Sequence, residues 1–108
     1  MNTEPYGYYP IYTNTVDYTN ETNPDALFAD GLESACIGHT EIWEKHPEGG
    51  ATRRTLVVYS KQKIIKHLIE DQQMTSSDAE DYAEYNIYNA YMGENTPLFV
   101  DETYHINL

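Results

Sequence analysis

The stretch TRRTLVVYSKQKIIKHLIED, residues 52–71, decides the fold of this chain. Its first part, around Val57, is a continuous β-prone run, which is typical of a strand covered on both faces. Ser60 can cap a following helix, because its hydroxyl can accept a hydrogen bond from a backbone N–H of the first turn. That helix would be amphipathic, with its apolar face formed by Ile64, Ile65, Leu68 and Ile69. A strand that runs directly into an amphipathic helix predicts a fold that mixes both kinds of element.

A second helix is predicted between Thr75 and Gly93. Thr75 is a plausible N-cap, with Asp78 three residues later in a near capping box. Gly93 is a natural residue for the position just after a helix end. On an α-helical wheel Asn86 falls on the small apolar face of this helix. We therefore expect its amide to be at least partly buried and hydrogen-bonded.

The remaining segments complete an α+β fold, with two amphipathic helices packed on a small, mainly antiparallel sheet. HTEIW (39–43) looks extended, HPEGG (46–50) is a turn by its Pro and Gly content, and TPLFVDE (96–102) is a closing strand. Residues 25–108 form the single domain, and Asn23-Pro24-Asp25 has the composition of a helix start. Residues 1–24 are a polar, Tyr-rich arm, either a strand on a sheet edge or an extended segment that orders on a partner.

The charge of the chain is strongly negative and unevenly distributed. The formal net charge is −12, and every Lys and Arg lies between Lys45 and Lys66. An anionic surface repels phosphates, so direct binding to nucleic acid is disfavoured. The acidity fits general solubility, an acidic interaction face, cation binding or imitation of a nucleic acid. No apolar stretch is long enough for a membrane span, and we expect no membrane partner.

Candidate chemical sites are weak. Cys36, the single cysteine, sits in an apolar run and reads as a buried structural thiol. HTEIWEKH (39–46) has spaced His and Glu residues but reads as a polar surface, so we expect neither a metal site, a cofactor nor a catalytic residue. Arg53 and Arg54 could receive an anion or a small ligand together with His39. Alternatively, the two arginines pair with the acidic segments of their own chain.

The predicted second helix carries the most suggestive surface pattern. Asp81, Glu84, Tyr85 and Tyr88 fall on one side of the wheel, where they would form an exposed stripe. Tyrosine is enriched where two protein surfaces meet. Carboxylates interspersed with aromatic rings could bind a basic patch or stand in for phosphates. The stripe therefore predicts a partner-binding face, with a merely solvated face as the alternative.

Residues 26–100 resemble a group of small, uncharacterised proteins encoded by tailed bacteriophages. The resemblance rests on ALFADGLESACIG (26–38) and on EYNIYNAYMGENTPLF (84–99), in which Asn86, Gly93, Glu94 and Thr96 match the recurring motif. Asn89 departs from it, because a Gly is expected at that position. The resemblance implies a bacteriophage protein acting in the host bacterial cytoplasm, and it implies no reaction. The four matching residues would form either a structural hinge or a shared site.

These observations predict a non-enzymatic acidic accessory protein that binds and inhibits or modulates a host protein with a basic surface. The target could be a defence factor or an enzyme that acts on nucleic acid, engaged by nucleic-acid mimicry. One alternative is a small-ligand or nucleotide-binding protein, or a small enzyme, that uses Arg53, Arg54 and His39. Another is a virion or assembly component. Self-association as a homodimer is a further option.

Overall fold

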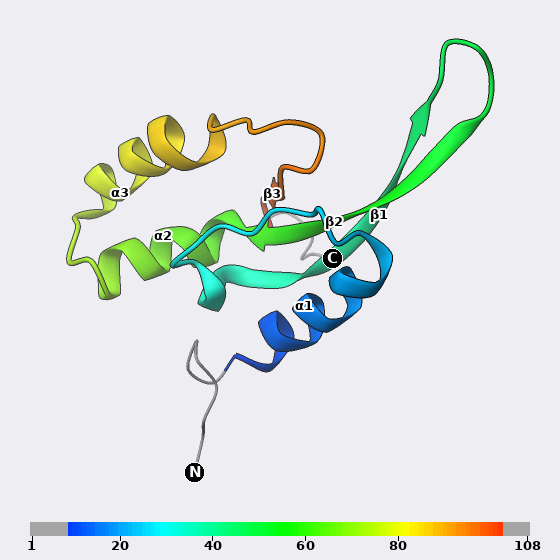
Figure 1. Cartoon of the computed structure of the whole chain (residues 1–108). Coiled ribbons are helices and arrows are strands. Elements are labelled where there is room, and N and C mark those ends of the chain that lie inside the picture. Colours follow the sequence, from blue (N-terminus) through cyan, green and yellow to red (C-terminus); the bar gives the residue numbers. More distant parts are fainter. Residues whose placement is uncertain (1–8, 103–108) are drawn as a thin grey trace, which may run out of the picture.

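The computed structural model describes residues 9–102, which have the predicted α+β fold (Figure 1). Helices and strands follow one another along the chain as α1 (Pro10–Thr22), η1 (Glu33–Ala35), β1 (Cys36–Lys45), β2 (Ala51–Ser60), α2 (Lys61–Glu70), α3 (Ser76–Ala83), η2 (Glu84–Tyr88) and β3 (Leu98–Val100). The element η1 is a 3-10 turn and η2 is a π-helical turn. The described residues contain one sheet, in the order β1-β2-β3.

The strands β1 and β2 form a long antiparallel hairpin that extends beyond the helices (Figure 1). Its turn is closed by hydrogen bonds between His46 and the two glycines, Gly49 and Gly50. Both glycines have positive φ angles, 109° and 83°, a conformation that is costly for other residues. The predicted strand in 52–60, the extended segment 39–43 and the turn 46–50 are thereby confirmed.

The short strand β3 closes the sheet beside the end of β2, as predicted for residues 96–102. Its register pairs Val58 with Leu98 and Ser60 with Val100, and the pairing is parallel. Parallel neighbours need a long crossover connection, which α2 and α3 provide here. The sheet is therefore mixed, although its longer ladder, between β1 and β2, is antiparallel.

The prediction of a strand or an extended arm is wrong from Pro10 onward, because residues 10–22 form the helix α1. Pro10 begins the helix, where its missing N–H costs nothing. Tyr12, Thr15 and Thr19 are buried and share one helical face. The hydroxyl groups of Thr15 and Thr19 donate to the carbonyls four residues earlier, so these buried polar groups are satisfied. The rest of the predicted arm, residues 1–8, lies outside the described residues.

The predicted helix start at residues 23–25 is also wrong, since Asn23 follows the last turn of α1. The N–H of Asn23 donates to Thr19 O, and its side-chain amide donates to Thr55 O at 2.8 Å. The chain then runs as a coil to η1. This coil is fixed to the sheet by the backbone N–H of Ala29, which donates to the hydroxyl of Tyr59 at 2.9 Å.

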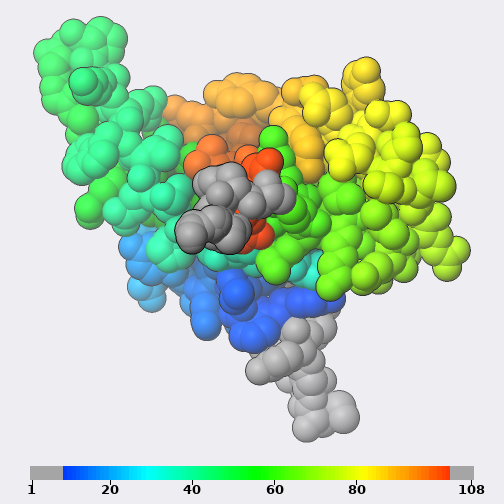
Figure 2. All heavy atoms as spheres, turned by 180° about the vertical axis from the view of Figure 1, so that it is seen from behind, coloured from blue at the N-terminus to red at the C-terminus, as the bar shows by residue number. Residues whose placement is uncertain are grey.

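The core lies where α1, the base of the hairpin, α2 and α3 meet. Its buried members are Tyr12, Leu32, Ala35, Cys36, Val57, Tyr59, Ile64, Leu68, Ala79 and Ala83. Two predicted caps set the ends of the core helices: Ser60 Oγ accepts from Lys63 N, and Thr75 Oγ1 accepts from Asp78 N. Figure 2 shows the rear of the molecule, with α1 across its lower part and the hairpin projecting from the opposite end to α2 and α3.

Candidate functional site

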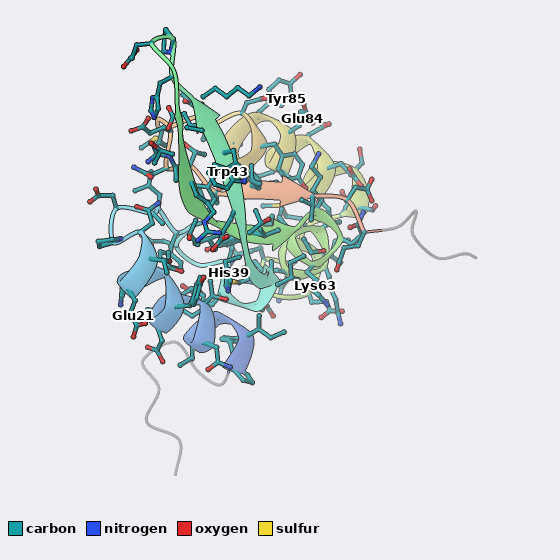
Figure 3. All side chains as sticks on the ribbon, turned by 90° about the vertical axis from the view of Figure 1, so that its right-hand side faces the viewer. Glu21, His39, Trp43, Lys63, Glu84 and Tyr85 are labelled. Atoms are coloured by element: carbon teal, nitrogen blue, oxygen red, sulfur yellow. The ribbon has the colours of Figure 1, made fainter. Side chains whose placement is uncertain are left out.

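Three of the four predicted partner-binding residues are exposed at the end of α3 and the start of η2. They are Asp81, Glu84 and Tyr85, which we call the acidic ridge. Tyr85 is 77% exposed. Figure 3 labels Glu84 and Tyr85 at the same end of this helical segment. Within residues 9–102, neither Asp81 nor Glu84 forms an ion pair with a basic side chain. The ridge therefore carries negative charge that the chain itself does not neutralise.

The π-helical turn corrects two predictions about neighbouring residues. A π turn contains more residues than an α turn, so it rotates the following side chains away from their α-helical positions. Asn86 is exposed, not buried, and donates to Tyr82 O at 3.2 Å. Ile87 packs against the core, and Tyr88 is half-buried beside it. Tyr88 is therefore not part of the exposed stripe that an α-helical wheel predicts.

Tyr88 lies instead over the sheet, between an aromatic ring and a cation. Its ring centroid is 5.7 Å from that of Phe99, and the Lys61 Nζ lies 4.7 Å from the Tyr88 centroid. Burial, with smaller contributions from the nearby carboxylates of Glu80 and Glu84, raises the pKa of Tyr88 to about 12. This phenol is consequently neutral over the whole physiological range.

Tyr88 opens onto a groove between the hairpin and residues 88–99, which we call the hairpin groove. Its volume is about 550 Å³. Among its lining residues are several that the sequence singles out: Arg54, Tyr88, Gly93, Glu94 and Thr96. The exposed aromatic side chain of Tyr91 also lies along it. The structure thus brings the C-terminal motif and one of the two arginines to the same place.

Arg54 is engaged inside this groove by its own chain. Its Nη2 lies 2.5 Å from Glu44 Oε1 and 3.4 Å from Glu94 Oε1, and its Nη1 donates to Asn95 Oδ1 at 3.2 Å. The Arg54 side chain is 18% exposed. The hydrogen bond from Arg54, with the attraction of its charge, lowers the pKa of Glu44. Arg54 therefore pairs with acidic segments of its own chain, which is one of the two alternatives that the sequence leaves open.

The other predicted motif residues shape the turn that carries Glu94. Gly93 has a φ of 104°, and the N–H and hydroxyl of Thr96 both donate to its carbonyl. The prediction that Gly93 ends the preceding helix is wrong, because η2 ends at Tyr88. Asn89, the departure from the motif, donates its amide to Glu84 O at 2.9 Å and so closes the π turn.

Arg53 and His39 lie on the opposite face of the hairpin from Arg54, because adjacent residues of a strand alternate in direction. Arg53 pairs with Glu41 at 3.3 Å, and its guanidinium lies 5.8 Å from the Trp43 ring. His39 stacks on Tyr18 of α1 at 4.0 Å (Figure 3 labels His39 and Trp43). The structure therefore does not bring the side chains of Arg53, Arg54 and His39 together.

A second hollow, which we call the apolar cavity, was not indicated by the sequence. It has a volume of about 520 Å³ and lies between the coil 27–32, the end of α2, one side of α3 and η2, and residues 92–99. Three large apolar side chains along it are partly or largely exposed: Leu27, Tyr82 and Met92. Its walls come from four separate segments, so no local pattern could have revealed it.

Other kinds of site find no support in residues 9–102. No helix in this range is long and apolar enough to cross a membrane. Nor does any group of three or more His, Cys, Asp or Glu side chains there have the arrangement of a metal site. The only cysteine, Cys36, is buried, and burial raises the pKa of its thiol.

Comparisons with known proteins do not assign the chain to a class, so we describe its class from its geometry. No family model, no curated protein and no solved structure matches it. The fold and surface define a small α+β protein with an uncompensated acidic ridge and two hollows. The bacteriophage group that the motif resembles stays a prediction.

Proposed function

We propose that this chain is a non-enzymatic binding protein that engages a protein partner with a basic surface through the acidic ridge. The observation that carries the proposal is the exposure of Asp81, Glu84 and Tyr85 without basic neighbours that pair with them. In contrast, Arg53 and Arg54 are occupied by carboxylates of the hairpin and of the turn at Glu94. The formal net charge of −12 remains whichever internal ion pairs form, because acidic residues outnumber basic ones.

The physical character of the ridge suits protein recognition. Exposed carboxylates steer a basic partner and raise the rate of encounter. Tyr85 can supply a large contact area at a small cost in side-chain entropy. The π turn supports this role, because such turns are frequent at functional sites. Negative charge on the surface also disfavours direct contact with nucleic acid.

The biological setting of the proposal rests on the motif alone. The resemblance of residues 84–99 favours a bacteriophage accessory protein that inhibits or modulates a host factor in the bacterial cytoplasm. A defence factor or an enzyme that acts on nucleic acid fits best, because such proteins present basic grooves that an acidic mimic can occupy. No observation favours the virion or small-ligand alternatives in the same way.

The test is affinity purification of the tagged protein from expressing bacteria, with quantitative mass spectrometry. The ridge variant is Asp81→Lys with Glu84→Lys. The matched control is Asp17→Lys with Glu21→Lys, which changes the charge equally on the exposed side of α1, where Figure 3 labels Glu21. Circular dichroism checks that both variants fold.

We expect a stoichiometric partner that the wild type and the control retain and the ridge variant loses. Equal losses in both variants would show that total charge, and not the ridge, drives the association. Full retention by the ridge variant would contradict the proposal directly. A partner that is recovered only at low salt would point to nonspecific attraction, because exposed charges are screened by salt.

A further inference from the structure

The apolar cavity adjoins the acidic ridge through the same helix. Tyr82 and Asn86 line the cavity, and the side-chain amide of Asn86 donates to Tyr82 O. Asp78 precedes Tyr82 by one further turn and is exposed. Asp81 and Tyr85 of the ridge occupy the next positions around the helix. A partner that reaches the ridge therefore also meets the mouth of the cavity.

The cavity walls are chiefly apolar, and part of that apolar surface is open to water. Met92 is 71% exposed, Tyr82 is 44% exposed and Leu27 is 36% exposed. The volume of about 520 Å³ falls within the range of roughly 300–1,000 Å³ that is usual for binding hollows. Exposed apolar residues gathered around a hollow mark an interaction site more strongly than the same residues scattered singly.

The charge around the cavity is negative. Asp30 lines it, and no Lys or Arg is among its lining residues. His67 also lines it, and its Nδ1 lies 2.8 Å from a carboxylate oxygen of Asp71. Asp78 and Asp81 add exposed negative charge from α3. An occupant must therefore combine apolar side chains with positive charge.

We propose that the apolar cavity receives the apolar face of a basic amphipathic helix of the partner, while the Lys or Arg side chains of that helix meet Asp78 and Asp81. The inference rests on the proposed function, since it assigns a type of recognition element to the same partner. Such helices bind by laying apolar anchors, spaced three or four residues apart, into a groove. The flexible Met92 side chain can adapt to an anchor of irregular shape.

The probe is a fluorescein-labelled synthetic peptide of Leu and Lys with an amphipathic helical pattern. A second peptide has the same Lys positions and Gln in place of every Leu. Fluorescence anisotropy at physiological salt gives the affinity of each peptide for the full chain. Ala90→Trp places a large side chain in the cavity, because Ala90 lines it. Ala51→Trp, on the exposed start of β2, is the matched control.

We expect the wild type to bind the Leu peptide at least tenfold more tightly than the Gln peptide. Ala90→Trp should remove this preference, and Ala51→Trp should preserve it. Met92→Gln is a second variant that removes apolar surface without filling the cavity, and it should reduce the preference even if Ala90→Trp proves too disruptive to fold. The Asp81→Lys, Glu84→Lys variant should weaken the binding of both peptides.

The outcomes separate the two proposals. Equal affinities of the wild type for the two peptides, or a preference that survives both Ala90→Trp and Met92→Gln, would overturn the inference about the cavity. If charge reversal on the ridge still weakened binding in that case, the proposed function would stand. If charge reversal had no effect on either peptide while the cavity variants did, the cavity would be the binding site and the ridge proposal would fail.

Discussion

The guanidinium of Arg54 lies 3.4 Å from the carboxylate of Glu94, which joins the middle of β2 to the turn after η2. The same guanidinium contacts Glu44 on β1 and Asn95 beside Glu94. Asn95 in turn accepts a hydrogen bond from the amide of Asn23, at the end of α1. One arginine thus links both strands of the hairpin to the turn that carries Glu94 and Asn95.

Replacing Arg54 should therefore destabilise the fold more than replacing its neighbour. Arg54→Met keeps much of the side-chain volume but removes the contacts to Glu44, Glu94 and Asn95. Arg53→Met is the matched control, because the Arg53 side chain is 60% exposed and pairs with one carboxylate. Urea unfolding at neutral pH should show a clear loss of stability for Arg54→Met and little change for Arg53→Met, since exposed ion pairs contribute little. Equal midpoints for the two variants would contradict this role of Arg54.

The pairing of Arg54 with Glu44 also predicts a dependence of stability on acidity. The hydrogen bond from Arg54 lowers the pKa of Glu44 in the folded chain below its ordinary 4.5. A carboxyl group with a lowered folded-state pKa stabilises the fold above its ordinary value, and this contribution is lost as the pH falls through the folded-state value. Urea unfolding from pH 7 down to about pH 3 should show a steeper decline for the wild type than for Arg54→Met. If the stability of the wild type and that of Arg54→Met fell equally with pH, the pair of Arg54 and Glu44 would be excluded as a source of the decline in stability.

The strand and helix around Ser60 could be predicted from sequence because their signals are local. Ser60 and Thr75 each accept a hydrogen bond from a backbone N–H three residues later, and the apolar residues of α2 have helical spacing. The helix α1 was missed for the opposite reason. Its threonines are β-prone in isolation, and they are tolerated in a helix because the hairpin buries one of its faces.

The candidate site was predictable only in part. Asp81, Glu84 and Tyr85 are exposed, as the helical wheel indicates. Because η2 is a π turn, Asn86 is exposed where the wheel predicts burial, and Tyr88 is half-buried where it predicts exposure. A wheel assumes α-helical geometry, so it cannot show this difference. The separation of Arg53 from Arg54 follows from strand alternation and could have been anticipated. The two hollows depend on contacts between segments far apart in the chain.

The packing of α2 gives a direct test of the core. Ile64 is fully buried, whereas Ile69 on the same helix is 36% exposed. Ile64→Ala should cost about 2–5 kcal/mol of unfolding free energy, because it removes buried methyl groups and leaves a cavity. Ile69→Ala should cost well under half as much, since much of its side chain already contacts water. Urea unfolding of both variants measures the difference, and similar losses would place α2 in another orientation.

The half-buried Tyr88 predicts a loss of stability in alkaline solution. Its pKa is raised by burial from 10.0 to about 12 in the folded chain. A phenol with a raised folded-state pKa contributes stability that is complete below the ordinary value and is lost as the pH rises through the folded-state value. Between pH 10 and pH 12 the unfolded chain ionises at this residue while the folded chain resists, so unfolding becomes progressively easier.

Tyr88→Phe isolates this effect, because it keeps the ring against Phe99 and removes only the ionisable hydroxyl. Urea unfolding at about pH 8 and about pH 11 should show a smaller alkaline loss for Tyr88→Phe than for the wild type. Tyr85→Phe is the matched control on the same turn, and its side chain is 77% exposed, so its loss should equal that of the wild type. If instead Tyr85→Phe reduced the loss and Tyr88→Phe did not, the two rings would have exchanged places, and the π turn with its rotation of Tyr88 toward the sheet would be wrong.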